Sequence, residues 1–227
     1  MEAPDPRLWS ERKARSWERL WEDLEIGYLD KDLVDILVEL FLRPKSFTTS
    51  SCSGRIVLMD ADMPWDKDET MIVFKKHEPI ELREVLEVAE KPIAHRLWLS
   101  VQGPIIHVET LDIDEAFVVL EAARRAGFKH SGILASTRKG VLVELRTGIR
   151  VNIPLREPTA WLVEKDALPR IVELANTALG QAKERLDRLR AELRRIRPPS
   201  LWTPPTLPPA ALHYLEVIGV KPSSLKA

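Results

Sequence analysis

The sequence predicts an α+β protein with a mixed or mostly antiparallel sheet, N-terminal helices and a long C-terminal helix. Two amphipathic helical patterns lie within residues 7–42, mostly strand-like runs with two shorter helices follow over residues 56–153, and a long helical pattern begins at Asp166. The βαβ alternation of a Rossmann fold is missing. No G-x-x-x-x-G-K-[ST] or G-x-G-x-x-G motif follows a strand, so a P-loop or Rossmann enzyme is not expected.

Composition narrows the class of protein. The 227 residues are 44% hydrophobic and 30% charged with a formal net charge of −1, which is typical of a soluble globular chain. A single cysteine excludes internal disulfides and a zinc site made of cysteines alone. There is no apolar run near 18 residues, so we expect a cytoplasmic protein. Seventeen prolines, many charges and few amides predict a thermophilic source.

The first helix is predicted over residues 7–25, where Trp9, Trp17 and Leu20 recur at helical spacing until Gly27. Asp30 is a suitable N-cap for a second helix ending at residue 42. Further helices are predicted over residues 81–89 and 112–126. Strands are expected over residues 56–59, 71–75, 96–101, 105–109, 132–135, 141–146 and 149–153.

The last helix should run from residue 166 to about 197, roughly 45 Å at the rise of an α-helix. Leu186, Leu189 and Leu193 alternate steps of three and four, as in a seam between helices. We therefore expect one α+β domain over residues 1–197. Residues 198–227 should form a proline-rich linker and a short docking segment.

The serine-rich segment between residues 47 and 55 reads as an unusual loop. Its hydroxyls, glycine and Arg55 could converge on a carboxylate or phosphate, although an ordinary polar loop is the alternative. Cys52 could be a nucleophile, but without a nearby base a small packing role is favoured.

The five histidines do not have the spacing of a helical metal site. His107 lies inside an apolar strand, where it is either a hydrogen-bonded structural residue or part of a site. His77 and His130 fall near strand ends, where functional residues often collect. Convergence of these histidines with the serine-rich segment on one cleft is a hypothesis.

Basic residues are concentrated in two helical segments. Residues 183–197 hold seven bases against three acids, and residues 7–19 hold five against two. These are either solvated helix faces or contacts for the phosphates of a structured RNA. Trp65 and Trp202 lie in loop-like segments and could stack on a base.

The run FTTSSCSGRI at residues 47–56 resembles the signature of the tRNA wybutosine-synthesizing protein 3 family. Supporting segments occur in the family's order over about residues 7–195. They are Asp35, His77, residues 105–108, residues 122–133, residues 151–155 and the pair Ala175–Asn176.

The resemblance implies an S-adenosylmethionine-dependent tRNA methyltransferase with a fold of its own and no metal. The family methylates N4 of the 7-aminocarboxypropyl-demethylwyosine base at position 37, in the anticodon loop of phenylalanine tRNA. His77 and His107 are the candidates for accepting a proton or for binding the base edge. The candidates for binding the cofactor, or the substrate's amino-carboxyl arm, are Ser50, Ser51, Ser53, Gly54, Arg55, Ser131 and Gly132. A non-catalytic tRNA-binding module and an interaction protein built on the long helix are the alternatives.

Overall fold

The computed structural model describes residues 4–66 and 70–225. The chain divides into two compact units. The first unit comprises residues 1–53, 105–147 and 185–227, and the second comprises residues 54–104 and 148–184. The expectation of a single methyltransferase domain over residues 1–197 stays a prediction.

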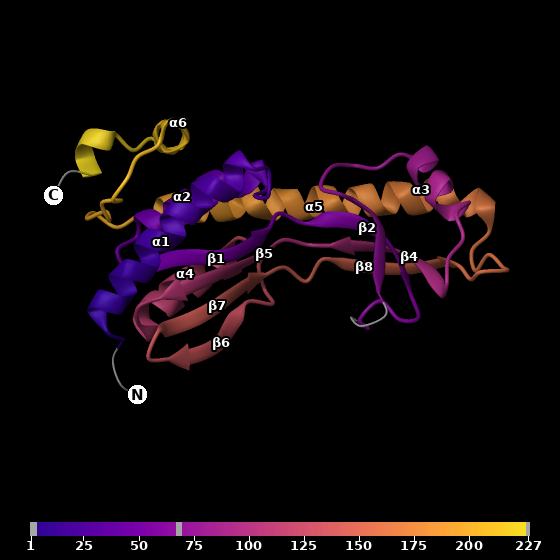
Figure 1. The fold of residues 1–227 in the computed structure, drawn as a ribbon, viewed down its shortest axis with the longest axis horizontal. Coiled ribbons are helices and arrows are strands. Elements are labelled where there is room, and N and C mark those ends of the chain that lie inside the picture. The colour runs from indigo at the N-terminus through magenta and orange to yellow at the C-terminus, as the bar shows by residue number, and fades with distance from the viewer. Residues whose placement is uncertain (1–3, 67–69, 226–227) are drawn as a thin grey trace. The chain divides into compact units, whose positions relative to one another are not determined.

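The first unit is built on a four-stranded antiparallel sheet (Figure 1). Its strands lie in the order β1 (Ser46–Cys52), β5 (Ile105–Thr110), β7 (Gly140–Arg146) and β6 (Gly132–Thr137). Along β5, Ile106 and Val108 are buried, whereas His107 and Glu109 are only half-buried on the opposite face. This alternation gives the sheet one apolar face and one polar face.

Five helices of the first unit share one hydrophobic core with this sheet. They are α1 (Pro6–Glu25), α2 (Val34–Leu42), α4 (Ile113–Arg125), the C-terminal part of α5 (Leu168–Arg195) and α6 (Pro209–Val217). Asp5 caps α1 by accepting a hydrogen bond from the Arg7 amide, and Asp112 caps α4 through the Glu115 amide. Every residue of α2 is buried, and a 3₁₀ turn at Lys31–Leu33 precedes it.

The C-terminal residues pack on α1 and α2. The indole nitrogen of Trp17 donates to the Thr206 carbonyl at 2.8 Å, and the Trp202 amide donates to the Leu42 carbonyl at 2.8 Å. The rings of Trp202 and Trp17 meet edge to face with centroids 5.9 Å apart. Trp202 is therefore a packing residue in this structure, contrary to the expectation that it lies open for a base.

The second unit is also a four-stranded antiparallel sheet. Its order is β3 (Met71–Lys76), β2 (Arg55–Ala61), β4 (Arg96–Gln102) and β8 (Arg150–Arg156). The core contains Ile56, Leu58 and Leu99 from the strands, together with residues of α3 (Leu82–Ala89) and of the first half of α5. A 3₁₀ helix at Lys165–Ala167 belongs to this unit, and another at Pro222–Leu225 belongs to the first unit.

The α+β class, the N-terminal helices and the long C-terminal helix are confirmed, and every pairing between the named strands is antiparallel. The serine-rich segment is the main difference, because residues 46–52 form strand β1 and not a loop. A strand would not be recognised here from serine and threonine alone, since the segment lacks an apolar alternation. Its conformation comes from pairing with β5. None of the helices in the described parts of the chain is long and apolar enough to cross a membrane.

Candidate active site

A pocket of about 390 Å³ lies in the first unit between α1 and β1. The strand contributes a row of hydroxyl-bearing residues, and the helix contributes two opposite charges, Arg19 and Asp23. Tyr28 and Leu29 beyond the end of α1 complete one side. The lining residues are Ser16, Arg19, Leu20, Asp23, Tyr28, Leu29, Leu37, Thr48, Thr49, Ser50 and Ser51.

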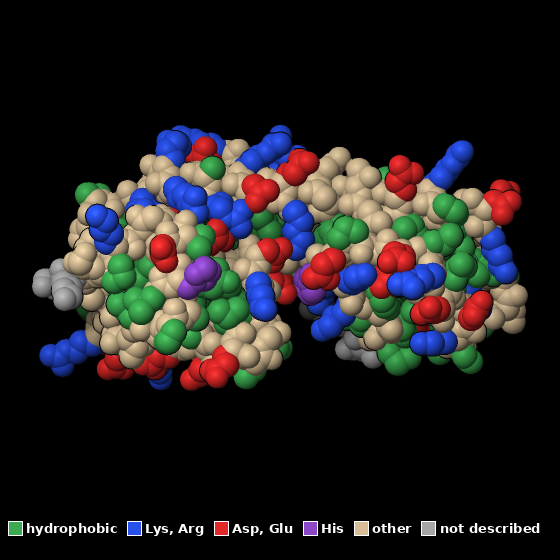
Figure 2. Space-filling view, turned by 90° about the horizontal axis from the view of Figure 1, so that it is seen from above, with side chains coloured by type: hydrophobic (Ala, Val, Ile, Leu, Met, Phe, Trp, Pro, Cys, Tyr) green, Lys and Arg blue, Asp and Glu red, His purple; other side chains and the backbone are tan. Residues whose placement is uncertain are grey.

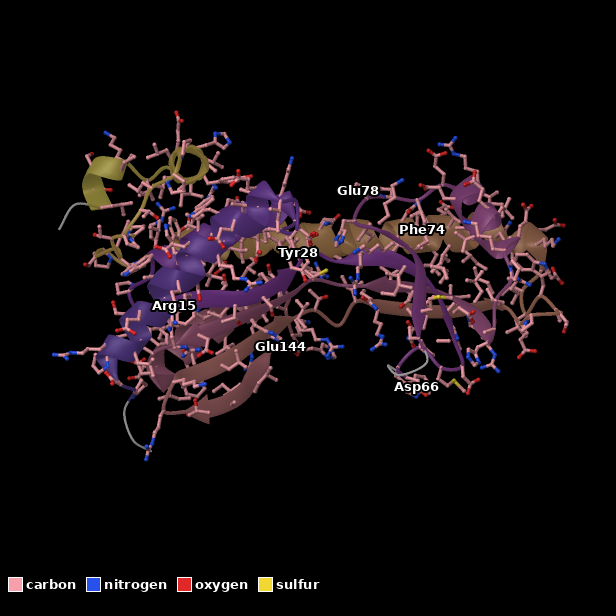
Figure 3. All side chains as sticks on the ribbon, in the orientation of Figure 1. Arg15, Tyr28, Asp66, Phe74, Glu78 and Glu144 are labelled. Carbon is pink, nitrogen blue, oxygen red and sulfur yellow. The ribbon has the colours of Figure 1, made fainter. Side chains whose placement is uncertain are left out.

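The charges of the pocket come from one face of α1. Arg19 and Asp23 are one helical turn apart, with the Arg19 Nε 3.4 Å from the Asp23 Oδ2. The backbone carbonyl of Asp23 accepts hydrogen bonds from the Tyr28 and Leu29 amides, which fixes the chain as it leaves the helix. The Tyr28 side chain is 77% exposed at this edge (Figure 3).

Next to the pocket, three side chains form a hydrogen-bonded chain across the sheet. Ser50 is opposite His107, and His107 is opposite Glu144, in the registers of β1–β5 and β5–β7. Directly opposite residues of antiparallel strands have their side chains on the same face. The Ser50 Oγ is 2.8 Å from the His107 Nδ1, and the His107 Nε2 is 3.2 Å from the Glu144 Oε2. Figure 3 labels Glu144 on β7.

A β-bulge positions the serine. The register of β1 against β5 shifts between Thr48 and Ser50, so Thr49 is the extra residue of the edge strand. Ser50 thereby faces His107 while it also lines the pocket. His107 therefore shares a hydrogen bond with a pocket residue, and its predicted role in the reaction stays a prediction.

The turn that follows β1 contains the other predicted residues of the signature. The Ser53 amide donates to the Asp30 Oδ2 at 2.7 Å. Gly54 has φ +92°, and a Cβ there would lie 3.0 Å from the Gln102 carbonyl oxygen, so glycine is required. The Arg55 Nε donates to the Gln102 Oε1 at 2.9 Å.

Ser53, Gly54 and Arg55 do not line the pocket found between α1 and β1. Their assignment to the cofactor stays a prediction. The same holds for His77, a residue of the second unit, whose Nδ1 donates to the Gly54 carbonyl at 3.0 Å.

Ser131 and Gly132 have structural contacts in the first unit. The Ser131 hydroxyl donates to the Phe128 carbonyl at 2.7 Å and accepts from the Arg146 amide at 2.9 Å. Gly132 is opposite Glu144 in the β6–β7 ladder and so lies at the far end of the row that begins at Ser50. Their role in binding a cofactor also stays a prediction.

Sequence reasoning missed Arg19, Asp23, Tyr28 and Glu144. Glu144 could have been noticed as a charged residue at an outward position of the alternating run VLVELR. Its position opposite His107 depends on the strand register, which no local pattern contains.

Charges of both signs occur on the face of the molecule that Figure 2 shows. Figure 2 shows Lys and Arg side chains interspersed with Asp and Glu over the visible face. Arg188, Arg194 and Arg195 of α5 are exposed, as expected from the leucine seam. Arg195 pairs with Glu192 at 2.7 Å, and Arg194 lies 3.6 Å from Glu39.

Comparison with known proteins identifies the class of protein. A profile of the family described as "Methyltransferase TYW3" matches residues 11–195, so the class is a methyltransferase without a Rossmann fold. The chain belongs to this family.

Two relatives carry the name tRNA(Phe) 7-((3-amino-3-carboxypropyl)-4-demethylwyosine(37)-N(4))-methyltransferase. The protein of Saccharolobus solfataricus is 44% identical over 184 residues, covering 81% of this chain and 88% of its own length. The protein of Thermococcus sibiricus is 34% identical over 186 residues, covering 82% of this chain and 94% of its own length. Relatives from thermophilic archaea agree with the source expected from the composition.

Solved structures agree with the fold. The PH1069 protein from Pyrococcus horikoshii superposes with a TM-score of 0.78 at 33% identity, over 82% of this chain and 96% of that chain. A hypothetical protein from Aeropyrum pernix superposes with a TM-score of 0.66 at 34% identity, over 72% of this chain and 96% of that chain.

Proposed function

We propose that this protein transfers a methyl group from S-adenosylmethionine to N4 of 7-(3-amino-3-carboxypropyl)-4-demethylwyosine at position 37 of tRNA(Phe). Support comes from the family and from the names of its relatives, which match nearly their full length to this chain. A tRNA substrate also supports the expected cytoplasmic location.

The main evidence for the binding site is the pocket between α1 and β1, which is lined by the hydroxyl-bearing residues of β1, one cation and one anion. The methionine end of S-adenosylmethionine carries an α-carboxylate and an α-ammonium group. Arg19 and the hydroxyls of Thr49 and Ser51 suit the carboxylate, and Asp23 suits the ammonium group. Ser50 and Ser51 are the residues of the sequence-based prediction that line this pocket.

When bound, S-adenosylmethionine supplies a methyl group on a positively charged sulfur. The residues of the chain must then orient the ring nitrogen toward that methyl and accept the proton that the nitrogen loses. His107 is the proposed acceptor because its Nδ1 contacts the pocket residue Ser50. This reaction needs no metal.

The exposed ring of Tyr28 offers a stacking surface at the edge of the pocket. Position 37 belongs to the single-stranded anticodon loop, where an enzyme can stack an unpaired base on an aromatic ring. Tyr28 is therefore the proposed contact for the tricyclic base.

The deciding experiment incubates the purified protein with S-adenosylmethionine and tRNA(Phe) carrying the 4-demethyl base. Nucleoside mass analysis should show a gain of one methyl group at position 37. Binding of S-adenosylmethionine without any methyl transfer would favour another acceptor, and tRNA binding without S-adenosylmethionine binding would favour a non-catalytic module.

Three variants locate the methyl-donor site. Arg19→Ala should weaken S-adenosylmethionine binding about tenfold or more, since a hydrogen bond to a charged group contributes about 1.5–3 kcal/mol. Arg15→Ala is the matched control, because Arg15 is one turn earlier on α1, exposed and not part of the pocket lining. If Arg55→Ala weakens binding while Arg19→Ala does not, the donor binds at the β1–β2 turn instead.

A further inference from the structure

We propose that Ser50, His107 and Glu144 form a proton relay that removes the proton from the ring nitrogen during methyl transfer. Ser50 is the residue that touches the substrate, His107 takes up the proton, and Glu144 is a positioning residue for the imidazole. The inference rests on the proposed function and adds the roles of Ser50 and Glu144 to it.

The geometry of the row fixes the order of the three groups. Ser50 lines the pocket and is exposed, whereas the side chains of His107 and Glu144 are 28% and 17% exposed. The row therefore runs from the pocket toward the middle of the polar face of the sheet. The two contacts, at 2.8 and 3.2 Å, have hydrogen-bond length.

The identity of the third residue determines the tautomer of the histidine. An ionised carboxylate can only accept hydrogen bonds, so Glu144 requires a proton on the His107 Nε2. In the neutral ring, Nδ1 then has a lone pair and accepts a hydrogen bond from the Ser50 hydroxyl. Arg146 places its Nη1 3.9 Å from the Glu144 Oε1, so a cation faces the carboxylate oxygen that does not contact His107.

This arrangement is that of a hydroxyl, a base and a carboxylate that orients the base. The proton balance is complete. As the ring nitrogen forms its bond to the methyl carbon, the bond from that carbon to sulfur breaks and sulfur keeps the electron pair. The N–H proton passes to the Ser50 oxygen, and the Ser50 hydroxyl proton passes to the His107 Nδ1. The products are the methylated base, S-adenosylhomocysteine and an imidazolium ion beside Glu144.

A second carboxylate on the same face provides a comparison. Glu109 is two residues from His107 on β5 and pairs with Arg12 at 2.7 Å, with a side chain that is 14% exposed. Glu109 resembles Glu144 in burial and in having a charged partner, but its ion pair is with α1. Glu109→Gln therefore measures how far the methyl-transfer rate falls when such a carboxylate is lost and the relay is left intact.

The experiment measures single-turnover methyl transfer with saturating S-adenosylmethionine and saturating demethylated tRNA(Phe). Glu144→Gln keeps the shape, but its amide can donate to the imidazole and favour the other tautomer. We expect its rate to fall at least about tenfold below that of Glu109→Gln, with S-adenosylmethionine affinity unchanged. The rate of the His107→Ala variant should fall about 10²–10⁴-fold, and added imidazole should restore part of that rate.

A Glu144→Gln rate within twofold of that of Glu109→Gln would overturn the relay, and so would a His107→Ala loss that imidazole leaves unchanged. Thermal unfolding of each variant identifies losses that come from folding, and Ser50→Ala provides a smaller change that removes only the hydroxyl. Absence of methyl transfer by the wild-type protein would overturn the proposed function and the relay together. An active wild type with an unaffected Glu144→Gln variant would overturn the relay alone.

Discussion

The bulge at Thr49 gives the hydroxyl-bearing residues on either side of it different surroundings, because residues two apart on a regular strand would share one face of the sheet. Thr48 is buried opposite Val108, whereas Ser50 is exposed opposite His107. A hydroxyl-bearing side chain suits both the buried and the exposed position, because it is short and can both donate and accept a hydrogen bond. The serine-rich sequence thus supplies one residue to the core and another to the pocket.

Cys52 is the residue of β1 whose chemistry most invites a covalent mechanism. It is half-buried at the end of the strand, opposite Ile105. Direct transfer of the methyl group needs no thioether intermediate, so we expect Cys52→Ser to retain more than about a tenth of the wild-type activity. Mass analysis of trapped protein and a rate assay check this. Complete loss of turnover with the fold intact, or a methylated Cys52, would contradict it.

Lys13 is the buried charge with the clearest consequence for stability. Burial lowers the pKa of its ammonium group well below the usual 10.5, and Arg43 lowers that pKa further, while Glu115 opposes the shift. The ammonium group donates to the carbonyls of Arg43 and Pro44 and lies 4.4 Å from the centre of the Trp202 ring.

The sign of the pH effect follows from that shift. Between the lowered pKa and about 10.5, the unfolded chain binds a proton at Lys13 that the folded protein does not, so stability rises with pH in this window. The free energy of unfolding of the wild type minus that of Lys13→Met should therefore increase as pH rises toward 10.5. Denaturant unfolding of both proteins over that range measures it, and a flat or falling difference would show that Lys13 stays protonated in the fold.

At the level of elements, the β6–β7 hairpin depends on one glycine. Gly140 has φ +124°, and a Cβ there would lie 2.6 Å from the Thr110 carbonyl oxygen and 2.9 Å from the Trp9 ring. Gly140→Ala should cost about 2–4 kcal/mol of unfolding free energy, because strain and close contact add. Thermal or denaturant unfolding measures the change.

Gly180 on α5 is the matched control for this substitution. A Cβ at Gly180 meets nothing within 4 Å, and the residue lies inside a helix. Gly180→Ala should stabilise the protein by about 0.5–1 kcal/mol, since alanine loses less backbone entropy in a helix. Equal effects at both positions would mean that the hairpin tolerates a side chain at Gly140.

At the level of the whole molecule, a net charge of −1 gives no overall attraction for RNA. Binding of tRNA must come from local cations such as Arg188, Arg194 and Arg195, which are exposed on α5. Neutralising all three should flatten the dependence of log affinity on log salt by about one unit for each phosphate that the variant no longer neutralises. S-adenosylmethionine affinity should stay nearly constant across the same salt series. Parallel tRNA slopes for wild type and triple variant would assign these arginines to the ion pairs of a solvated helix.

Much of the fold was predictable because helices and apolar strands are local. The leucine seam of α5 and the cap Asp112 involve residues only a few positions apart, and hydrophobic spacing and cap chemistry reveal them. The expectation that Asp30 caps the second helix was wrong, because a 3₁₀ turn precedes α2 and the Asp30 carboxylate accepts a hydrogen bond from the Ser53 amide instead. β1 was missed for the opposite reason. Its residues have no apolar alternation, and the strand is held by β5, a partner far away along the chain.

The class of this protein, its family signature and the helices at its two ends can be inferred from the sequence without coordinates. Periodicity, caps and an uncommon motif are properties of neighbouring residues, so they survive without coordinates. The folded chain alone shows that Ser50, His107 and Glu144 form one row and that Arg19 and Asp23 line a pocket with β1. Strand register and the packing of α1 depend on contacts between segments that are distant along the chain. A one-residue slip of a strand would turn its side chain in the row to the other face of the sheet, so the row exists only in this register.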